Sequence, residues 1–262
     1  MIKFFRKIRQ NLLSEGKTGK YLKYAIGEIV LVVIGILIAL SINNWNENKK
    51  DRKEEYQTLK SLQSEFIESR ELFYKGQHHN KMIFEGMESL LEILDAEMVN
   101  ENMVDSIYFH LNTSSWSSST FEPSRGIVNS LINSGKLNII SNDKLKSHLI
   151  QWNDQVISFQ NTQKLAQDYK FTYLFPLISE LTQLPSKLKL YSGNNNYDLS
   201  NVKPQEVDLE LLKSKIFYNY LNQSWVYSGS ILVNNTRTNR GGKILMALDN
   251  IISLIDKELE NK

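Results

Sequence analysis

The hydrophobic pattern of the chain begins with one uninterrupted apolar run. Residues 25–42 read AIGEIVLVVIGILIALSI and contain a single charged side chain, Glu28. A helix of about 18 such residues is long enough to cross the hydrocarbon core of a bilayer. Tyr24 and Trp45 bracket the run, about 31 Å apart along a helix, and their rings suit the two membrane interfaces. The pattern predicts a transmembrane helix over residues 24–45.

Beyond this run, apolar residues recur in stripes of helical period. Neither glycine nor proline occurs between Gly35 and Gly76, so the transmembrane helix is expected to continue into a long stalk helix, a rod of about 50 residues and roughly 75 Å. A turn is expected at residues 76–79. The stripes are Leu59, Leu62, Phe66 and Phe73; Met82, Met87, Leu90, Leu91 and Leu94; Leu145, Leu149, Trp152, Val156 and Phe159; Leu209, Leu212, Ile216 and Tyr220; and Ile244, Leu248, Ile251, Ile255 and Leu259. Because such stripes bury one another, the predicted fold class is all-α, with an antiparallel helical bundle over residues 46–262.

Local signals place the breaks between these helices. Residues 136–140 and 230–234 have weak β character, but neither has a pairing partner at hairpin spacing. Pro176 should kink or end its helix, and residues 184–204 are typical of a long irregular loop. Ser141 is a suitable N-cap for the helix of the third stripe.

The Ser/Thr-rich run NTSSWSSST and the residues after it are the most individual part of the outer domain. Pro123 suits the first turn of a helix and Gly135 the left-handed residue after its end, which predicts a tight helix-turn-helix corner. One interpretation of this region is purely architectural. The other is a partner or ligand loop formed by Trp116, Phe121 and Arg125, because an aromatic side chain in such a loop is a usual anchor for a partner or glycan.

Charges on the two sides of the apolar run predict its orientation. Seven lysines and arginines and one acid precede it, a net charge of about +6, whereas the basic residues after it alternate with acids. Since basic flanks stay in the cytoplasm, the N-terminus is predicted to be cytoplasmic and everything after Trp45 to lie outside. A cleaved signal peptide is the competing interpretation, because residues 39–41 loosely fit a cleavage site. The basic and apolar regions are both longer than usual for one, so we expect an uncleaved signal anchor.

Residues 1–23 add a second membrane signal. Phe4, Ile8 and Leu12 share a helical face and basic side chains occupy much of the rest, a pattern typical of an amphipathic helix on an anionic leaflet. An ordinary basic flank is the alternative. In either case 23 residues cannot form a domain with its own core, so any cytoplasmic output needs a partner.

Composition and motifs exclude several classes of function. The absence of cysteine excludes a disulfide framework and a zinc-thiolate site, and a net charge of about −3 over residues 46–262 argues against nucleic-acid binding. The adjacent His78 and His79 would point about 100° apart on a helix, so they cannot chelate one metal together. Residues 240–243 lack the first glycine and the hydroxyl residue of a phosphate-binding loop, and a helix break or loop is expected there. No catalytic, cofactor or metal site is predicted, and we do not expect an enzyme.

One face of the transmembrane helix suggests an interaction. Glu28 lies one turn inside the cytoplasmic edge, where a carboxylate is costly unless it snorkels or pairs. Gly35, Ala39 and Asn43 continue the same face, and the small residues of Gly35-x-x-x-Ala39 permit close approach of a second helix. We therefore predict that this face binds a second copy of the chain or another membrane protein. Simple snorkelling of Glu28 is the alternative.

Two blocks of the sequence resemble a known family. MIKFFRKIRQNLLSEGKTGKYLKYAIGEIVLVVIGILIALSINNWNE and PSRGIVNSLINSGKLNIISNDKL, of about 47 and 23 residues, resemble an uncharacterised family of single-span membrane proteins common in Bacteroidota. The resemblance implies an anchor in the inner membrane and a helical outer domain, which the orientation predicted from the charges places in the periplasm. It implies no catalytic residues.

Three interpretations of function follow. The preferred one is an interaction or scaffold subunit, whose partners are the lipid bilayer and either a second copy or another membrane protein. The second is an extracytoplasmic sensor or ligand-binding module that signals through a membrane partner, and it requires an apolar pocket with convergent polar groups. The third is a membrane-tethered enzyme, which requires spatially clustered His, Asp and Glu side chains.

Overall fold

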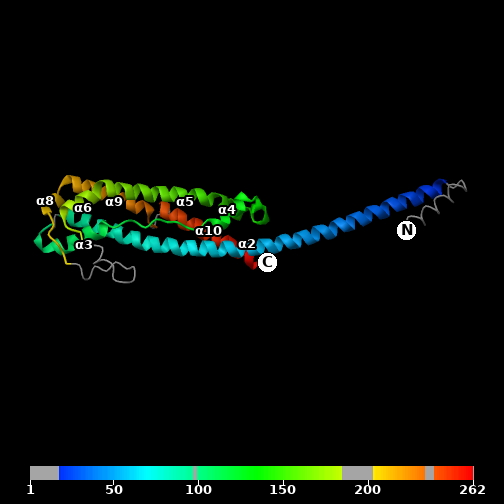
Figure 1. The fold of residues 1–262 in the computed structure, drawn as a ribbon, viewed down its shortest axis with the longest axis horizontal. Coiled ribbons are helices and arrows are strands. Elements are labelled where there is room, and N and C mark those ends of the chain that lie inside the picture. Colours follow the sequence, from blue (N-terminus) through cyan, green and yellow to red (C-terminus); the bar gives the residue numbers. More distant parts are fainter. Residues whose placement is uncertain (1–17, 97–98, 185–202, 234–238, 262) are drawn as a thin grey trace. The chain divides into compact units, whose positions relative to one another are not determined.

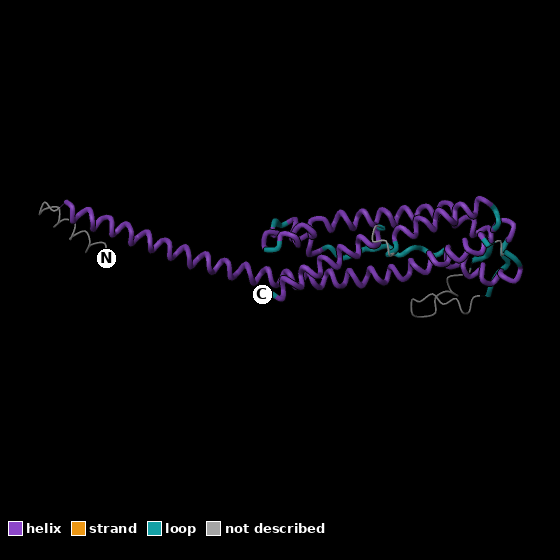
Figure 2. The backbone as a smooth tube through the Cα atoms, turned by 180° about the vertical axis from the view of Figure 1, so that it is seen from behind, coloured by secondary structure: helices purple, strands orange, loops and turns teal. Residues whose placement is uncertain are grey.

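A computed structural model of the chain describes residues 18–96, 99–184, 203–233 and 239–261. The described residues are almost entirely helical and contain no strand, only an isolated bridge between Thr182 and Val207 (Figure 2). The predicted all-α fold is therefore confirmed. The chain divides between Gln57 and Thr58 into two compact units.

The described part of the first unit is the N-terminal part of helix α2 (Thr18–Asp95), up to Gln57. The large apolar side chains of Ala25–Ile42 are exposed, by 70% at Leu31 and 56% at Leu37. Among the described residues, α2 is the one helix that is long and apolar enough to cross a membrane. The predicted continuation of the apolar helix into a longer one is confirmed, because α2 has no break between Thr18 and Asp95.

The second unit is a bundle of long helices (Figure 1). Its elements are the outer part of α2, η1 (Glu101–Met103), α3 (Val104–Ser114), α4 (Gly126–Asn133), η2 (Lys136–Ile139), α5 (Asp143–Tyr169), the π-helical η3 (Lys170–Leu174), α6 (Phe175–Leu181), α8 (Leu209–Leu212), α9 (Lys215–Ile231) and α10 (Arg240–Glu260). Helices α2 and α5 run in the same direction, since Phe66 packs on Trp152 and Phe73 on Phe159.

Helices α9 and α10 run antiparallel to that pair. Gln63 bonds to Asp256 in α10, whereas Gln77, further along α2, bonds to the carbonyl of Ile231 at the end of α9. The bundle therefore has three helical columns: α2, then α5 with η3 and α6, then α9 with α10. The fourth column is α3 followed by an extended segment, residues 115–125, which we call the strap. Figure 1 shows the strap running along the bundle from α3 to α4.

Two hydrophobic clusters form the core of the bundle. One joins α2, α4, α5 and α10, and the other joins α2, α3, α6 and α9. The first, third and fifth predicted stripes are confirmed, because all their members are buried except Leu259, which packs against the first cluster. Burial at these positions supplies most of the stabilisation expected for helices of this length.

Met87, Leu90 and Leu91 of the second stripe are buried as predicted, but the turn expected at residues 76–79 does not exist. Gly76 lies inside α2, and a β-carbon there would lie 3.2 Å from Ser119 Oγ. A glycine costs about 1 kcal/mol inside a helix, which the packing on both sides outweighs. With no break, the helical phase continues from Phe73, so Ile83 is buried and Met82 is 37% exposed.

The fourth stripe is wrong at Ile216, whereas Leu209 and Tyr220 pack against the second cluster. Helix α8 ends at Leu212, and Ser214 caps a new helix by accepting a hydrogen bond from the Phe217 amide. This break resets the phase, so Phe217 is fully buried whereas Ile216 is 48% exposed.

The corner between α4 and α5 agrees with its prediction at Gly135, whereas the predictions for Pro123 and Ser141 are wrong. Gly135 has φ 69°, the left-handed conformation expected there. Helix α4 begins at Gly126, three residues after Pro123, and Asn142 replaces Ser141 as the N-cap of α5. The weak β segment at residues 136–140 is mostly the 3₁₀ helix η2.

Pro176 is accommodated without ending its helix. The π-helical turn η3 precedes it and leads directly from α5 into α6, with the proline in the first turn of α6. A π turn changes the hydrogen-bond register, which removes the clash that proline makes with an α-helical backbone. Most of the predicted loop at residues 184–204 lies outside the described residues.

Candidate functional site

The predicted association face lies on the helix of the first unit. Gly35, Ala39 and Asn43 are exposed and Glu28 is half-exposed. A β-carbon at Gly35 would meet nothing within 4 Å, and Asn43 donates a hydrogen bond to Glu47 Oε1 at 3.1 Å. The face is thus an open surface on a helix of exposed apolar residues. Pairing through it remains a prediction.

The second unit holds its strap through buried amide side chains. Asn80 of α2 makes a two-point contact with Ser119: its Oδ1 accepts from the amide at 2.7 Å and its Nδ2 donates to the carbonyl at 3.0 Å. From α5, Gln163 accepts from the Phe121 amide at 3.0 Å and donates to the Ser119 carbonyl at 3.1 Å. Gln160 donates to the Phe121 carbonyl at 2.9 Å. A buried extended backbone needs hydrogen-bond partners, which a neighbouring strand supplies in a sheet. Here the amide side chains supply them.

Two further side chains fasten the start of the strap. His79 lies with Nε2 2.8 Å from the Ser117 carbonyl and stacks on the Trp116 ring at 6.0 Å with an interplanar angle of 7°. Since a carbonyl only accepts, Nε2 carries the hydrogen. The Lys170 ammonium donates to the Trp116 carbonyl.

The other end of the strap is fastened by Glu65 of α2. Its Oε2 accepts from Ser124 Oγ at 3.1 Å and from the Ile127 amide at 3.0 Å. The Ile127 amide belongs to the first turn of α4, which has no capping hydrogen bond from its own N-cap side chain. A carboxylate at a helix N-terminus is favourable, so Glu65 both caps α4 and fixes where the strap ends.

Lys170 is the most unusual side chain in the bundle. It begins the π turn, it is only 1% exposed, and its Nζ lies 5.6 Å from the centre of the Phe171 ring. Burial lowers the pKa of Lys170 from 10.5 to about 7, because a charged amine is poorly solvated there. Perturbed groups of this kind are candidates for a functional role.

The proposed partner loop is enclosed by the bundle. Trp116 and Phe121 are 7% and 4% exposed, and Phe121 packs edge-on against Phe73 at 5.3 Å. Arg125 is half-buried at the start of α4. Two buried aromatic rings favour the architectural interpretation over a loop that binds a partner.

The two adjacent histidines do not lie in the turn that was expected for them. His78 is exposed and His79 half-buried, on α2 and not in a turn. Within the described ranges no group of three His, Asp or Glu side chains is arranged to hold a metal ion. Sequence reasoning missed Asn80, Gln163 and Lys170, although each interrupts an apolar face.

No curated protein and no solved structure matches the chain. A family-level match covers the apolar segment of α2, the strap, α4 and the first half of α5, and therefore includes Asn80 and Glu65 but not Gln163 or Lys170. Over residues 28–155 the chain is similar to a family of unknown function (DUF6090).

Proposed function

We propose that this chain is a single-pass membrane protein that acts as an interaction or scaffold subunit. The observation that carries the proposal is the exposed apolar surface of Ala25–Ile42 in the first unit, since the second unit has a hydrophobic core of its own. An exposed apolar surface of this extent is stable in a bilayer and would aggregate in water. The bundle needs no lipid to bury its stripes.

The proposed orientation places the N-terminus in the cytoplasm and the bundle in the periplasm, with the helix uncleaved in the inner membrane. Its support is the basic flank of residues 1–23. The proposal includes no catalytic step and no nucleic-acid partner.

The proposed contact is the face of Glu28, Gly35, Ala39 and Asn43. A helix that bears small residues at a spacing of four lets a second backbone approach closely. No described residue would lie within 4 Å of a β-carbon at Gly35, so a second copy or another membrane protein can occupy this space.

Crosslinking of the intact protein in native membranes, followed by purification and mass spectrometry, tests the proposal. The wild type should yield a reproducible partner, either itself or another membrane protein, and Gly35→Ile should lose it. Val33→Ile is the matched control, since Val33 lies about 160° around the helix from Gly35. The absence of any reproducible partner would overturn the scaffold role. Equal capture by both variants would instead overturn the assignment of the face.

A further inference from the structure

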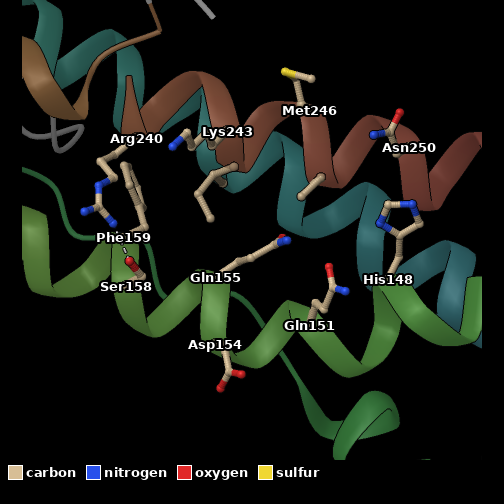
Figure 3. A pocket seen from close by; sticks show the side chains of 12 residues that line it. His148, Gln151, Asp154, Gln155, Ser158, Phe159, Arg240, Lys243, Met246 and Asn250 are labelled. Carbon is tan, nitrogen blue, oxygen red and sulfur yellow. Dashed lines mark hydrogen bonds between the residues drawn. The ribbon is translucent and has the colours of Figure 1, made fainter. Parts of the chain in front are cut away.

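A groove of about 420 Å³ lies between α5 and α10 in the second unit (Figure 3). Its floor is apolar and is made by Phe159, Ile244 and Ala247, which are 1%, 2% and 6% exposed. This volume lies within the range of small-molecule sites, which are mostly apolar with a few polar groups. The groove extends along α5 from Ser158 to His148, about 15 Å at 1.5 Å per residue.

The first turn of α10 is held rigidly at one end of the groove. A β-carbon on Gly241 would lie 2.5 Å from the Ile231 carbonyl oxygen, so only glycine allows α10 to approach the end of α9 this closely. Asn239 caps the helix by accepting from the Gly242 amide at 2.8 Å. The sequence RGGK is therefore the start of a helix and not the break or loop expected there.

Two cationic side chains project from this turn. Arg240 and Lys243 both line the groove, and Arg240 donates a hydrogen bond across it to Ser158 Oγ. Asp154 is the one acidic side chain among the lining residues, and Figure 3 shows it pointing away from α10. The two cations therefore face the groove with no carboxylate opposite them.

Neutral polar groups enter along the rest of the groove. The Gln155 carboxamide extends from α5 toward α10 (Figure 3), and its Oε1 is buried with no hydrogen-bond partner among the described residues. His148 and Asn250 line the far end.

We propose that this groove binds a single-chain anionic amphiphile such as a fatty acid. Its carboxylate would contact Arg240 and Lys243, where charge-assisted hydrogen bonds form, and its alkyl chain would cover Phe159, Ile244 and Ala247. The charge complementarity selects an anion, and the length and apolar floor select an extended chain over a compact phosphate or sugar. This assignment goes beyond the scaffold role, because it requires neither the membrane helix nor a protein partner.

Photolabelling of the full chain tests this assignment. The protein is held in a peptide-based membrane mimetic, free of detergent micelles, and exposed to dodecanoate bearing a diazirine on its chain. Peptides from residues 148–159 and 240–250 should carry the label, and excess unmodified dodecanoate should compete. Each methylene removed from the competitor should weaken competition by about fourfold, from the transfer energy of a buried methylene.

Matched variants identify the head-group contact. The double change Arg240→Gln and Lys243→Gln should reduce labelling of these peptides at least tenfold. Lys257→Gln, an exposed lysine of α10 outside the groove lining, should label like the wild type. Both positions of the double variant are exposed, so its helical circular dichroism should be retained. Labelling confined to the membrane helix, equal labelling of all variants, or equal competition by dodecanol or inorganic phosphate would each overturn the proposal.

Discussion

Replacing Lys170 with methionine should remove most of the dependence of bundle stability on pH above neutrality. Methionine keeps the length of the apolar stem and removes the amine that donates to the Trp116 carbonyl. In the unfolded chain the amine holds its proton up to its usual pKa of 10.5, whereas burial lowers the pKa in the folded bundle to about 7. Between these values the unfolded state binds more protons, so stability rises with pH.

The size of the effect follows from the two pKa values. Each pH unit within this window is worth about 1.4 kcal/mol, so the wild type should gain about 3 kcal/mol between pH 7.5 and 9.5. Below pH 7 both states are protonated and the full cost of burying the charge remains. Three other shifts act mainly outside pH 7.5–9.5: burial lowers the pKa of His110 from 6.5, and it raises the pKa of Tyr108 and Tyr169 from 10.0. The hydrogen bond to Asp95 likewise raises the pKa of Tyr218 from 10.0.

Urea unfolding of residues 50–262, followed by circular dichroism at pH 7.5, 8.5 and 9.5, measures this slope. Lys170→Met leaves the Trp116 carbonyl without its donor, at a cost of about 1–3 kcal/mol that does not vary with pH. The unfolding free energy of the variant should therefore be nearly independent of pH. Relative to the unfolding free energy of the wild type, it should rise as the pH falls. Lys164→Met, an exposed lysine on α5, is the control. Parallel curves for the wild type and Lys170→Met would refute the linkage to this residue.

Three further predictions concern folding, topology and the strap. Residues 50–262 alone should unfold cooperatively with a helical circular dichroism spectrum, and a spectrum dominated by strand or coil would contradict this. A periplasm-active reporter should work after Lys262 and be silent after Gly16, and mature protein beginning at Ile42 would reveal a cleaved signal peptide instead. Asn80→Ala should destabilise the bundle by about 1–3 kcal/mol, since it leaves the Ser119 amide without its acceptor, whereas the Ser119 carbonyl keeps the donor from Gln163. Hydrogen exchange should show lost protection at that amide before global unfolding.

The helical elements were largely predictable because their apolar residues repeat with a single period. Leu145 to Phe159 and Ile244 to Ile255 keep one phase throughout, and every predicted position there is buried. The predicted stripes were wrong where the positions of the buried residues depend on whether the helix is interrupted. Gly76 suggested a helix break, but tertiary packing keeps α2 continuous there. Ser214 begins a new helix, although the apolar spacing from Leu209 to Tyr220 is that of a single helix.

The strap could not be derived in the same way. Its sequence is polar and low in periodicity, which is equally typical of a surface loop. Its burial depends on partners about 40 residues away, such as Asn80 and Gln163. The groove likewise requires the approach of α5 to α10, and Ser158 and Arg240, which bond across it, lie 82 positions apart.

The strap also accounts for the burial of Lys170. An extended segment that runs along a helical bundle has main-chain carbonyls that need hydrogen-bond donors. The backbone amides of the helices cannot supply them, because they are already bonded within their own helices. The donors that remain are side chains long enough to reach from a helix, and lysine, glutamine, asparagine and histidine qualify. Each carbonyl left alone would cost about 1–3 kcal/mol, which offsets much of the penalty for placing an amine inside. A helical bundle that contains an extended segment is therefore expected to bury polar side chains on the helices that face this segment. In this sequence they interrupt the apolar stripes at Asn80, Gln163 and Lys170.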